Sequence, residues 1–203
     1  MAALARGLSI LQAFDRPGAL YTVSELARRV GLSQPTTWRL CGTLLDRGFL
    51  VKAPGSAALR IGAPALTLGY AAIHGQDLPG LVRPYMAQLT EDLRTTVSLS
   101  LYSQAEMLSV DQTYGSFVVP GQPVGWRASA ASSSGGLAVL AVLPEAELDA
   151  ALAQIAARSP EAWPRRRDRV AQARAHFAAH GYVVMADMFN GQYIAASVPL
   201  IEG

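Results

Sequence analysis

The sequence predicts an α+β protein, with a winged helix-turn-helix at its N-terminus and a second domain in which helices cover an antiparallel sheet. Three observations lead to this fold class. Residues 22–39 form two amphipathic helical stretches around a turn at Gly31, the pattern of a helix-turn-helix. Two short apolar stretches joined by a Pro-Gly-Ser turn follow, as in a wing. Beyond residue 96, strands are followed by helices and then by strands again, which is typical of an α+β sheet.

Composition bounds the class of protein. The chain has 203 residues, of which 51% are hydrophobic and 16% are charged, enough for a core and one or two domains. Residues 1–62 hold eight Lys or Arg and three acidic residues, a net charge of +5, whereas residues 63–203 hold nine basic and twelve acidic residues, a net charge of −3. A basic segment beside an acidic one favours a domain that binds a polyanion, although small asymmetries also arise by chance.

Cysteine usage and hydropathy indicate a compartment. Cys41 is the single cysteine of the sequence, so no internal disulfide is possible, and its place on an apolar helix face favours a small buried side chain. No apolar run approaches the roughly 18 to 20 residues that span a bilayer, and the N-terminus lacks a signal-peptide core. We therefore expect a cytoplasmic protein with no membrane partner.

The first helices follow from apolar spacing and capping residues. A helix is expected at 4–14, with one apolar face formed by Leu4, Leu8, Leu11 and Phe14. Thr22 and Glu25 make the T-x-x-E pattern of a capping box, which begins the next helix. That helix is expected to bury Val23, Leu26, Ala27 and Val30. Gly31 ends it, because this position requires a left-handed backbone.

The second helix of the motif begins after Ser33, which is predicted to cap it. Helical spacing turns one set of side chains toward the core: Thr37, Leu40, Cys41 and Leu44. Another set lies off that face: Gln34, Thr36, Trp38 and Arg39. Gly48 ends the helix, and strands at 49–52 and 59–61 form the wing.

The remaining elements complete three segments: a winged helix at 1–62, a linker helix within 63–77, and a second domain at 78–203. Helices are predicted at 65–74, 81–93, 137–143, 145–157 and 165–180. Strands are predicted at 96–102, 107–110, 117–124, 182–185 and 194–199.

The order of these pieces resembles the IclR family of bacterial transcriptional regulators. The resemblance rests on ALARGLSILQAF, on T-x-x-E-L-A-R-R-x-G-L, on Trp-Arg before LCGTLLDRGFL and on LRIGAPALTLG in the first part. In the second part it rests on LVRPYMAQLTEDLRTTVSLSLY, LAVLAVLP, the Arg-rich helix before HGY, and IAASVP. It implies a winged helix, a linker helix and a GAF-like effector-binding domain. Family members act as dimers or tetramers on operator DNA and respond to small metabolites, often organic acids or aromatic compounds.

The sequence departs from the family at the expected effector pocket. Residues 131–137 lack the His and Lys that members commonly carry, Met185 precedes Asp187 in a shorter loop, and Tyr193 stands where a cysteine is common. These differences imply a less cationic and more apolar pocket. The chain also stops at Gly203, and the resemblance therefore predicts a C-terminal end that is incomplete relative to the family.

DNA contact is predicted for the second helix and the wing. Arg39 can bind guanine with two hydrogen bonds and Gln34 can pair with adenine, while Lys52 and Arg60 can contact phosphates. Two alternatives stay open: Arg39 pairs with Asp46 or Glu25, and Trp38 packs against the first helix of the motif. The predicted DNA-binding residues are Arg28, Ser33, Gln34, Thr36, Thr37, Trp38, Arg39, Lys52 and Arg60.

The effector site is predicted around the serine run that begins a helix, where free backbone N–H groups can hold a carboxylate or carbonyl oxygen. Simple capping by serine is the alternative, and each apolar member is also a candidate for the core. By matching positions, the predicted effector-binding residues are Met107, Ser132, Ser133, Ser134, Gly135, Met185, Asp187, Phe189 and Tyr193.

Catalysis finds little support. The chain has no G-x-S-x-G elbow, ASSSGG lacks the lysine of a P-loop, and His176 and His180 have no evident third metal ligand. We predict no catalytic residue, metal or cofactor. The sequence favours an effector-controlled regulator that binds double-stranded operator DNA as a homodimer or homotetramer. The alternatives are a constitutive DNA binder whose second domain only oligomerises and, third, an enzyme.

Overall fold

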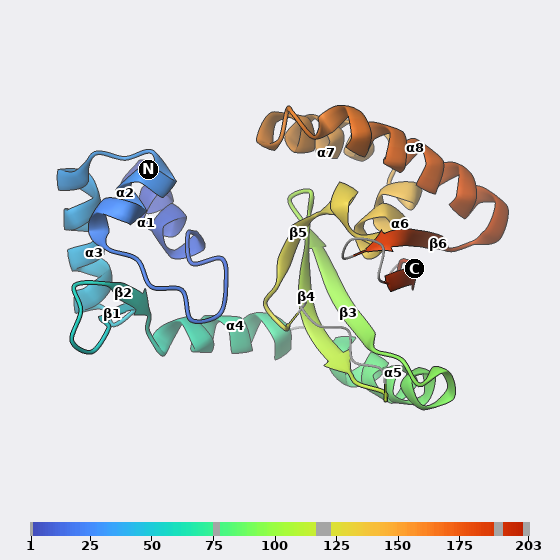
Figure 1. Cartoon of the computed structure of the whole chain (residues 1–203), viewed down its shortest axis with the longest axis horizontal. Coiled ribbons are helices and arrows are strands. Elements are labelled where there is room, and N and C mark those ends of the chain that lie inside the picture. Colours follow the sequence, from blue (N-terminus) through green and yellow to red (C-terminus); the bar gives the residue numbers. More distant parts are fainter. Residues whose placement is uncertain (1, 75–77, 117–122, 189–192, 201–203) are drawn as a thin grey trace. The chain divides into compact units, whose positions relative to one another are not determined.

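The computed structural model describes residues 2–74, 78–116, 123–188 and 193–200 (Figure 1). The chain divides into two compact units, Met1–Leu78 and Pro79–Gly203, and each is described by itself. No helix within the described ranges is long and apolar enough to cross a membrane.

The first unit is a helix-turn-helix followed by a two-stranded hairpin and a further helix. Its elements are α1 (Ala2–Gln12), α2 (Val23–Val30), α3 (Gln34–Asp46), β1 (Leu50–Lys52), β2 (Leu59–Ile61) and α4 (Pro64–His74). β1 and β2 are antiparallel, with Leu50 opposite Ile61 and Lys52 opposite Leu59. The predicted helices and wing strands of this unit are therefore present, with ends shifted by a few residues.

Local sequence signals fix the two helices of the motif. Thr22 and Glu25 form the predicted capping box at the start of α2, in which each side chain bonds the other residue's backbone N–H. At the other end Gly31 has a φ of 66°, the left-handed conformation that glycine adopts without strain. The turn to α3 is thus set by glycine, as predicted.

The core of the first unit joins α1, α2, α3 and the wing through Ile10, Leu26, Cys41, Leu50 and Leu59. One prediction was wrong. Leu4 and Leu8, predicted to share one apolar helix face with Leu11 and Phe14, are 72% and 50% exposed. The face of α1 that contacts the core is rotated toward Ile10, because α1 packs against α2 and α3 through Ile10 and Leu11.

The second unit contains helices and two antiparallel sheets. Its helices are α5 (Leu78–Leu93), η1 (Ala130–Ser132, a 3₁₀ turn), α6 (Ser134–Val142), α7 (Glu145–Arg158) and α8 (Trp163–His180). Its strands are β3 (Val97–Ser103), β4 (Glu106–Thr113), β5 (Arg127–Ser129), β6 (Val183–Met188) and β7 (Tyr193–Ser197). Among the described residues the strands form one sheet in the order β3-β4-β5 and a second of β6 and β7.

The predictions for this unit hold for most elements. The predicted strand at 117–124 falls mainly on residues outside the described ranges, and residues 124–125 form a turn. β5 was missed because three residues give too little alternation to recognise a strand. β4 is longer than predicted and reaches Thr113.

α6 lies at the centre of the second core. Leu137, Ala138 and Leu140 are buried, and α6 packs against α8, β6 and β7. An added Cβ at Gly136 would overlap the carbonyl oxygen of Ala130 in η1. The glycine therefore allows the start of α6 to lie directly against the turn that precedes it.

Candidate functional site

The surface of α3 is set by bonds at its first turn. Ser33 has the extended backbone of an N-cap residue, but its hydroxyl donates to Oγ1 of Thr36 (2.9 Å) and makes no capping bond to the backbone. The amide of Gln34 donates to the hydroxyl of Ser24 in α2 (2.9 Å). The first contact lies within the first turn of α3, and the second links the start of α3 to α2.

The outward face of α3 carries exposed side chains within the first unit. Trp38 is 68% exposed, so it does not pack against α2, which removes one of the two alternatives for this residue. Arg39 is exposed and has no ion pair with Asp46, Glu25 or any other acidic residue that the structure describes. The side of α3 away from the core thus carries the side chains of Gln34, Trp38 and Arg39.

Thr37 does not belong to this surface. It has no exposed area, and its hydroxyl donates to the carbonyl oxygen of Ser33 (3.0 Å). Its prediction as a DNA-binding side chain is corrected, because helical spacing turns Thr37 toward the core together with Cys41.

The wing presents its two cations in different directions. Lys52 and Arg60 are both exposed. Val51 lies opposite Arg60 and Lys52 lies opposite Leu59, and side chains alternate between the faces of a strand pair. Lys52 and Arg60 therefore leave opposite faces of the hairpin.

The two arginines at the end of α2 differ. Arg28 is exposed, whereas Arg29 forms an ion pair with Asp15 (2.6 Å) and lies 4.6 Å from the ring centre of Tyr21. Arg29 is occupied within the fold, which leaves Arg28 as the cation of this pair available to DNA.

At the predicted effector site, serine capping is present. Ser133 is the N-cap of α6, and the backbone N–H of Gly136 donates to its hydroxyl (3.2 Å). Ser134 is buried and accepts a hydrogen bond from the hydroxyl of Ser197, beside it in β7 (2.8 Å). Two of the three predicted serines therefore have partners within the protein.

The apolar residues predicted around this helix start lie in the core. Met107 and Met185 are 4% and 7% exposed and belong to the same cluster as Leu137. Tyr193 is half-buried at the start of β7. Asp187 lies in β6, where the structure describes its backbone only. Phe189 lies outside the described residues.

Ser109 is a residue that the sequence reasoning missed. It is buried in β4, and its hydroxyl has no hydrogen-bond partner among the described residues. It lies two residues after Met107, so both face the same side of the strand. The predicted strand at 107–110 already contained Ser109, and alternation from Met107 would have placed its side chain on that face.

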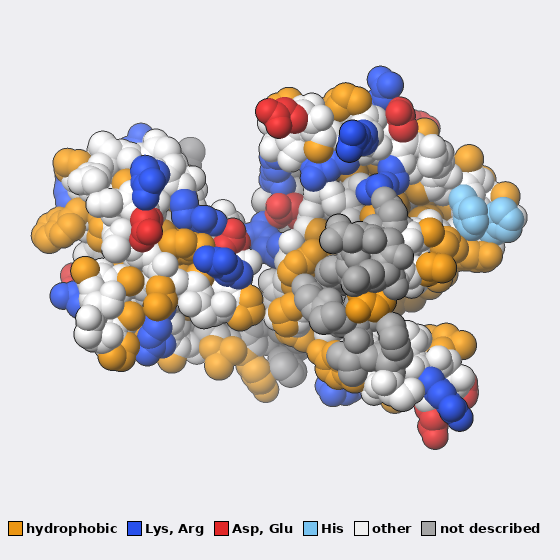
Figure 2. Space-filling model, viewed as in Figure 1, with side chains coloured by type: hydrophobic (Ala, Val, Ile, Leu, Met, Phe, Trp, Pro, Cys, Tyr) orange, Lys and Arg blue, Asp and Glu red, His pale blue; other side chains and the backbone are white. Residues whose placement is uncertain are grey.

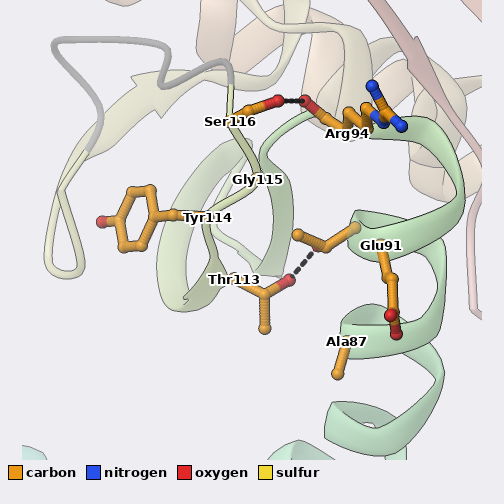
Figure 3. A pocket seen from close by; sticks show the side chains of 8 residues that line it. Ala87, Glu91, Arg94, Thr113, Tyr114, Gly115 and Ser116 are labelled. Carbon is orange, nitrogen blue, oxygen red and sulfur yellow. Dashed lines mark hydrogen bonds between the residues drawn. The ribbon is translucent and has the colours of Figure 1, made fainter.

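Two surface depressions lie elsewhere in the second unit. One, of about 530 Å³, lies between α5 and the end of β4; there the hydroxyls of Thr90 and Thr113 are 2.6 Å apart, and Ser116 bonds the carbonyl of Arg94 (Figure 3). No described member of the predicted effector set lines it. The other, of about 480 Å³, is lined by Ser132 and by residues of α8.

The histidines of α8 bind backbone groups. Nδ1 of His176 donates to the carbonyl of Tyr182 (2.9 Å), and Nδ1 of His180 donates to the carbonyl of His176 (3.0 Å). In the described part of the chain, no three His, Cys, Asp or Glu side chains are grouped so that they could hold a metal ion.

A winged helix-turn-helix in which the second helix of the motif, here α3, is exposed is the fold of a class of DNA-binding proteins. Residues 3–54 match the IclR helix-turn-helix domain. The chain is 28% identical over 148 residues to the transcriptional repressor IclR of Escherichia coli, covering 71% of this chain and 54% of that protein. The chain belongs to the IclR family, and it spans about half the length of the curated relatives it matches.

Solved structures agree over the whole chain. An IclR family transcriptional regulator from Brucella abortus superimposes with a TM-score of 0.88 at 29% identity, over 100% of this chain and 77% of that one. An IclR homologue from Microbacterium hydrocarbonoxydans, solved in complex with 4-hydroxybenzoate, has a TM-score of 0.70 at 21% identity, over 98% of this chain and 83% of that one. The second likeness supports the fold alone.

Proposed function

We propose that this protein is a sequence-specific, DNA-binding transcriptional regulator controlled by a small-molecule effector. The observation that carries the proposal is the outward face of α3, where Trp38 and Arg39 are exposed and Arg39 has no acidic partner in the described ranges. A recognition helix of this kind enters the major groove with such side chains toward the base edges.

In this proposal, Arg39 and Gln34 read bases, while Arg28, Ser33, Thr36 and one wing cation contact the backbone. Because the side chains of Lys52 and Arg60 leave opposite faces of the hairpin, they contribute unequally to DNA binding. The winged helix comprises 1–62, a linker helix lies within 63–77, and 78–203 forms the effector-binding and oligomerisation domain of a cytoplasmic homodimer or homotetramer.

The proposed effector site lies at the buried start of α6, between Met107 and β6. Supporting it are the buried hydroxyl of Ser109, which lacks a partner among the described residues, and an apolar surrounding of Met107 and Met185. This lining suits an aromatic compound with one polar group. The 4-hydroxybenzoate bound to the Microbacterium relative is likewise aromatic, and it carries a hydroxyl and a carboxylate. In this regulatory role the protein catalyses no reaction, and we propose no enzymatic activity for it.

DNA binding is tested with the promoter region next to the protein's own gene. Arg39→Ala should weaken binding by about 1–3 kcal/mol, roughly ten-fold or more, because a two-bond contact to guanine is lost. Arg47→Ala, just past the end of α3, removes the same charge without a base contact and should change affinity much less. Equal losses in both variants, or none, would contradict the proposed reading of bases.

Effector control is tested by repeating the binding measurement with aromatic and carboxylic compounds. A ligand shifts DNA affinity only if it binds the DNA-bound and free arrangements differently. We expect an aromatic acid to change the affinity of the wild type and to lose that effect in Ser109→Ala. A DNA affinity that no compound alters would favour the alternative, a constitutive regulator whose second domain only oligomerises.

A further inference from the structure

A depression with one acidic and one basic side chain lies on the second unit between α5 and the end of β4. Its volume is about 530 Å³, within the range of small-molecule sites. Figure 2 shows basic and acidic side chains next to each other over α5, at the lower right of the view. Glu91 and Arg94 are the charged members of the described lining, which therefore has no net charge. The lining of this site, here called the α5 depression, includes Glu91, Arg94, Thr113, Tyr114, Gly115 and Ser116.

Neither charged side chain has a partner among the residues that the structure describes. Arg83 of the same helix pairs with Asp111 (3.5 Å), whereas Glu91 and Arg94 make no ion pair and no side-chain hydrogen bond there. Glu and Arg three positions apart in a helix ordinarily meet. Arg94, however, follows the last residue of α5 and has a left-handed backbone, with a φ of 52°, so its side chain departs from the helical spacing.

The loop after β4 fixes Arg94 in this conformation. The hydroxyl of Ser116 donates to the carbonyl oxygen of Arg94 (3.4 Å), and a Cβ at Gly115 would overlap the backbone of Arg94. This conformation separates the guanidinium group of Arg94 from the carboxylate of Glu91. Figure 3 shows these two side chains on one side of the depression and Tyr114 on the other.

The neutral polar groups of the lining have partners within the protein. The hydroxyls of Thr90 and Thr113 lie 2.6 Å apart, and that of Thr113 donates to the carbonyl oxygen of Met86 (3.2 Å). The hydroxyl of Tyr114 donates to the side-chain oxygen of Gln112 (2.7 Å), and its residue is 56% exposed, so the ring offers an apolar face. A ligand in the depression therefore meets one cation, one anion and one aromatic ring.

We propose that the α5 depression binds a free α-amino acid with an aromatic side chain. The guanidinium group of Arg94 binds the carboxylate of the amino acid through two parallel hydrogen bonds. The carboxylate of Glu91 accepts hydrogen bonds from its ammonium group, and its ring packs against Tyr114. A zwitterion matches a lining without net charge, whereas an anion or a cation alone leaves one protein charge without a partner. Because the contacts come from α5 and from the end of β4, the ligand joins these two elements.

The test is a titration of the whole chain with L-phenylalanine, followed through the NMR signals of the backbone amides. The signals of Gly115 and Ser116 should shift at millimolar ligand, because charge pairs at an open surface give modest affinity. Two related compounds each lack one charge: 3-phenylpropionate has no ammonium group and phenethylamine has no carboxylate. Each should bind at least about five-fold more weakly than phenylalanine.

Variants of the two charged residues assign the contacts. Arg94→Gln and Glu91→Gln each remove one charge and should weaken phenylalanine binding by about five-fold or more. Arg94→Lys, which keeps the charge but loses the fork, should weaken it by a smaller factor. Asp92→Asn removes a carboxylate from an exposed neighbouring position of α5 outside the depression and should change binding by less than about two-fold.

Three results would overturn the proposal. One is the absence of any shift at Gly115 and Ser116 in wild type whose spectrum shows it to be folded. Another is an equal loss in Glu91→Gln and Asp92→Asn, which means general attraction by charge. The third is phenylalanine binding that persists in Arg94→Gln and disappears in Ser109→Ala, which assigns the ligand to the proposed effector site. Because phenylalanine binding is measured without DNA, its failure leaves the proposed regulatory function untouched.

Discussion

The side-chain amide of Gln34 donates a 2.9 Å hydrogen bond to the hydroxyl of Ser24. The bond is exposed and joins the second residue of α2 to the first residue of α3. It orients Gln34, a predicted base reader, before any DNA is present. Gln34 must give up or share this bond in order to reach an adenine edge.

This relationship predicts different outcomes for the two partners. Gln34→Ala should weaken operator binding by about 1–3 kcal/mol, because the two bonds to adenine are lost. Ser24→Ala should leave operator affinity unchanged or slightly higher, since Gln34 no longer exchanges one partner for another. Both affinities are measured at one fixed salt concentration, because phosphate contacts make them salt-dependent. A loss in Ser24→Ala as large as that in Gln34→Ala would mean that the bond acts only by holding the two helices together.

The capping box of α2 predicts a pH dependence. The pKa of Glu25 lies below its ordinary value of 4.5, first because of the hydrogen bond from the backbone N–H of Thr22 and then because of the Thr22 hydroxyl. The folded state therefore favours the ionised form. Its stabilising contribution is fully present above pH 4.5 and is lost as the pH falls through the depressed pKa of the folded state.

Glu25→Gln isolates this contribution. Glutamine also serves in a capping box, but it does not titrate. Urea denaturation at a pH of about 7 and of about 3 should therefore show a wild-type advantage at neutral pH that shrinks or disappears in acid. All other titrating groups are the same in both proteins. A difference between the two urea midpoints that is equal at both pH values would exclude the ionised Glu25 as its source.

Sequence reasoning succeeded where the signal is local. The capping box, Gly31 and Gly48 delimit α2 and α3 without reference to the rest of the fold. It failed where the outcome depends on packing: the choice of Ile10 over Leu4 and Leu8 as the core face of α1 is made by the position of α2 and α3. Two apolar faces on one helix give the same periodicity, so the sequence alone does not rank them.

The candidate sites follow the same rule. Helical spacing accounts for the exposure of Trp38 and Arg39. The same spacing places Thr37 on the core face, so the prediction of Thr37 as a DNA contact contradicted the helical pattern. For the effector site, sequence matching indicated the start of α6, but it did not reveal that Ser134 is bonded to Ser197. That contact joins residues 63 positions apart, and no local pattern specifies such a pairing.

Two neighbouring glycines at the start of α6 predict opposite effects on stability. Gly136→Ala should destabilise the second unit by about 1–3 kcal/mol, because its Cβ would overlap the carbonyl of Ala130. Gly135→Ala meets only Cε of Met107 at 3.8 Å, an ordinary contact, and alanine favours a helix by up to about 1 kcal/mol over glycine. Thermal denaturation of the two variants should therefore show a lower midpoint for Gly136→Ala and an equal or higher one for Gly135→Ala. Equal losses would mean that both positions need glycine for a ligand or backbone movement.

Cys41 offers a direct measurement of how the first unit opens. Its side chain is 1% exposed, and burial raises the pKa of the thiol. Because the thiolate is the reactive form, iodoacetamide should modify the native protein far more slowly than the denatured chain. Leu26→Ala removes a fully buried neighbour in the same core and should cost about 2–5 kcal/mol, which accelerates labelling at least thirty-fold if reaction requires opening of this core. Met86→Ala, at a buried position of the second unit, serves as the control and should leave the labelling rate unchanged if the units open independently. Labelling that is fast in the native wild type, or unaffected by Leu26→Ala, would show that the thiol is reached without unfolding of the helix-turn-helix.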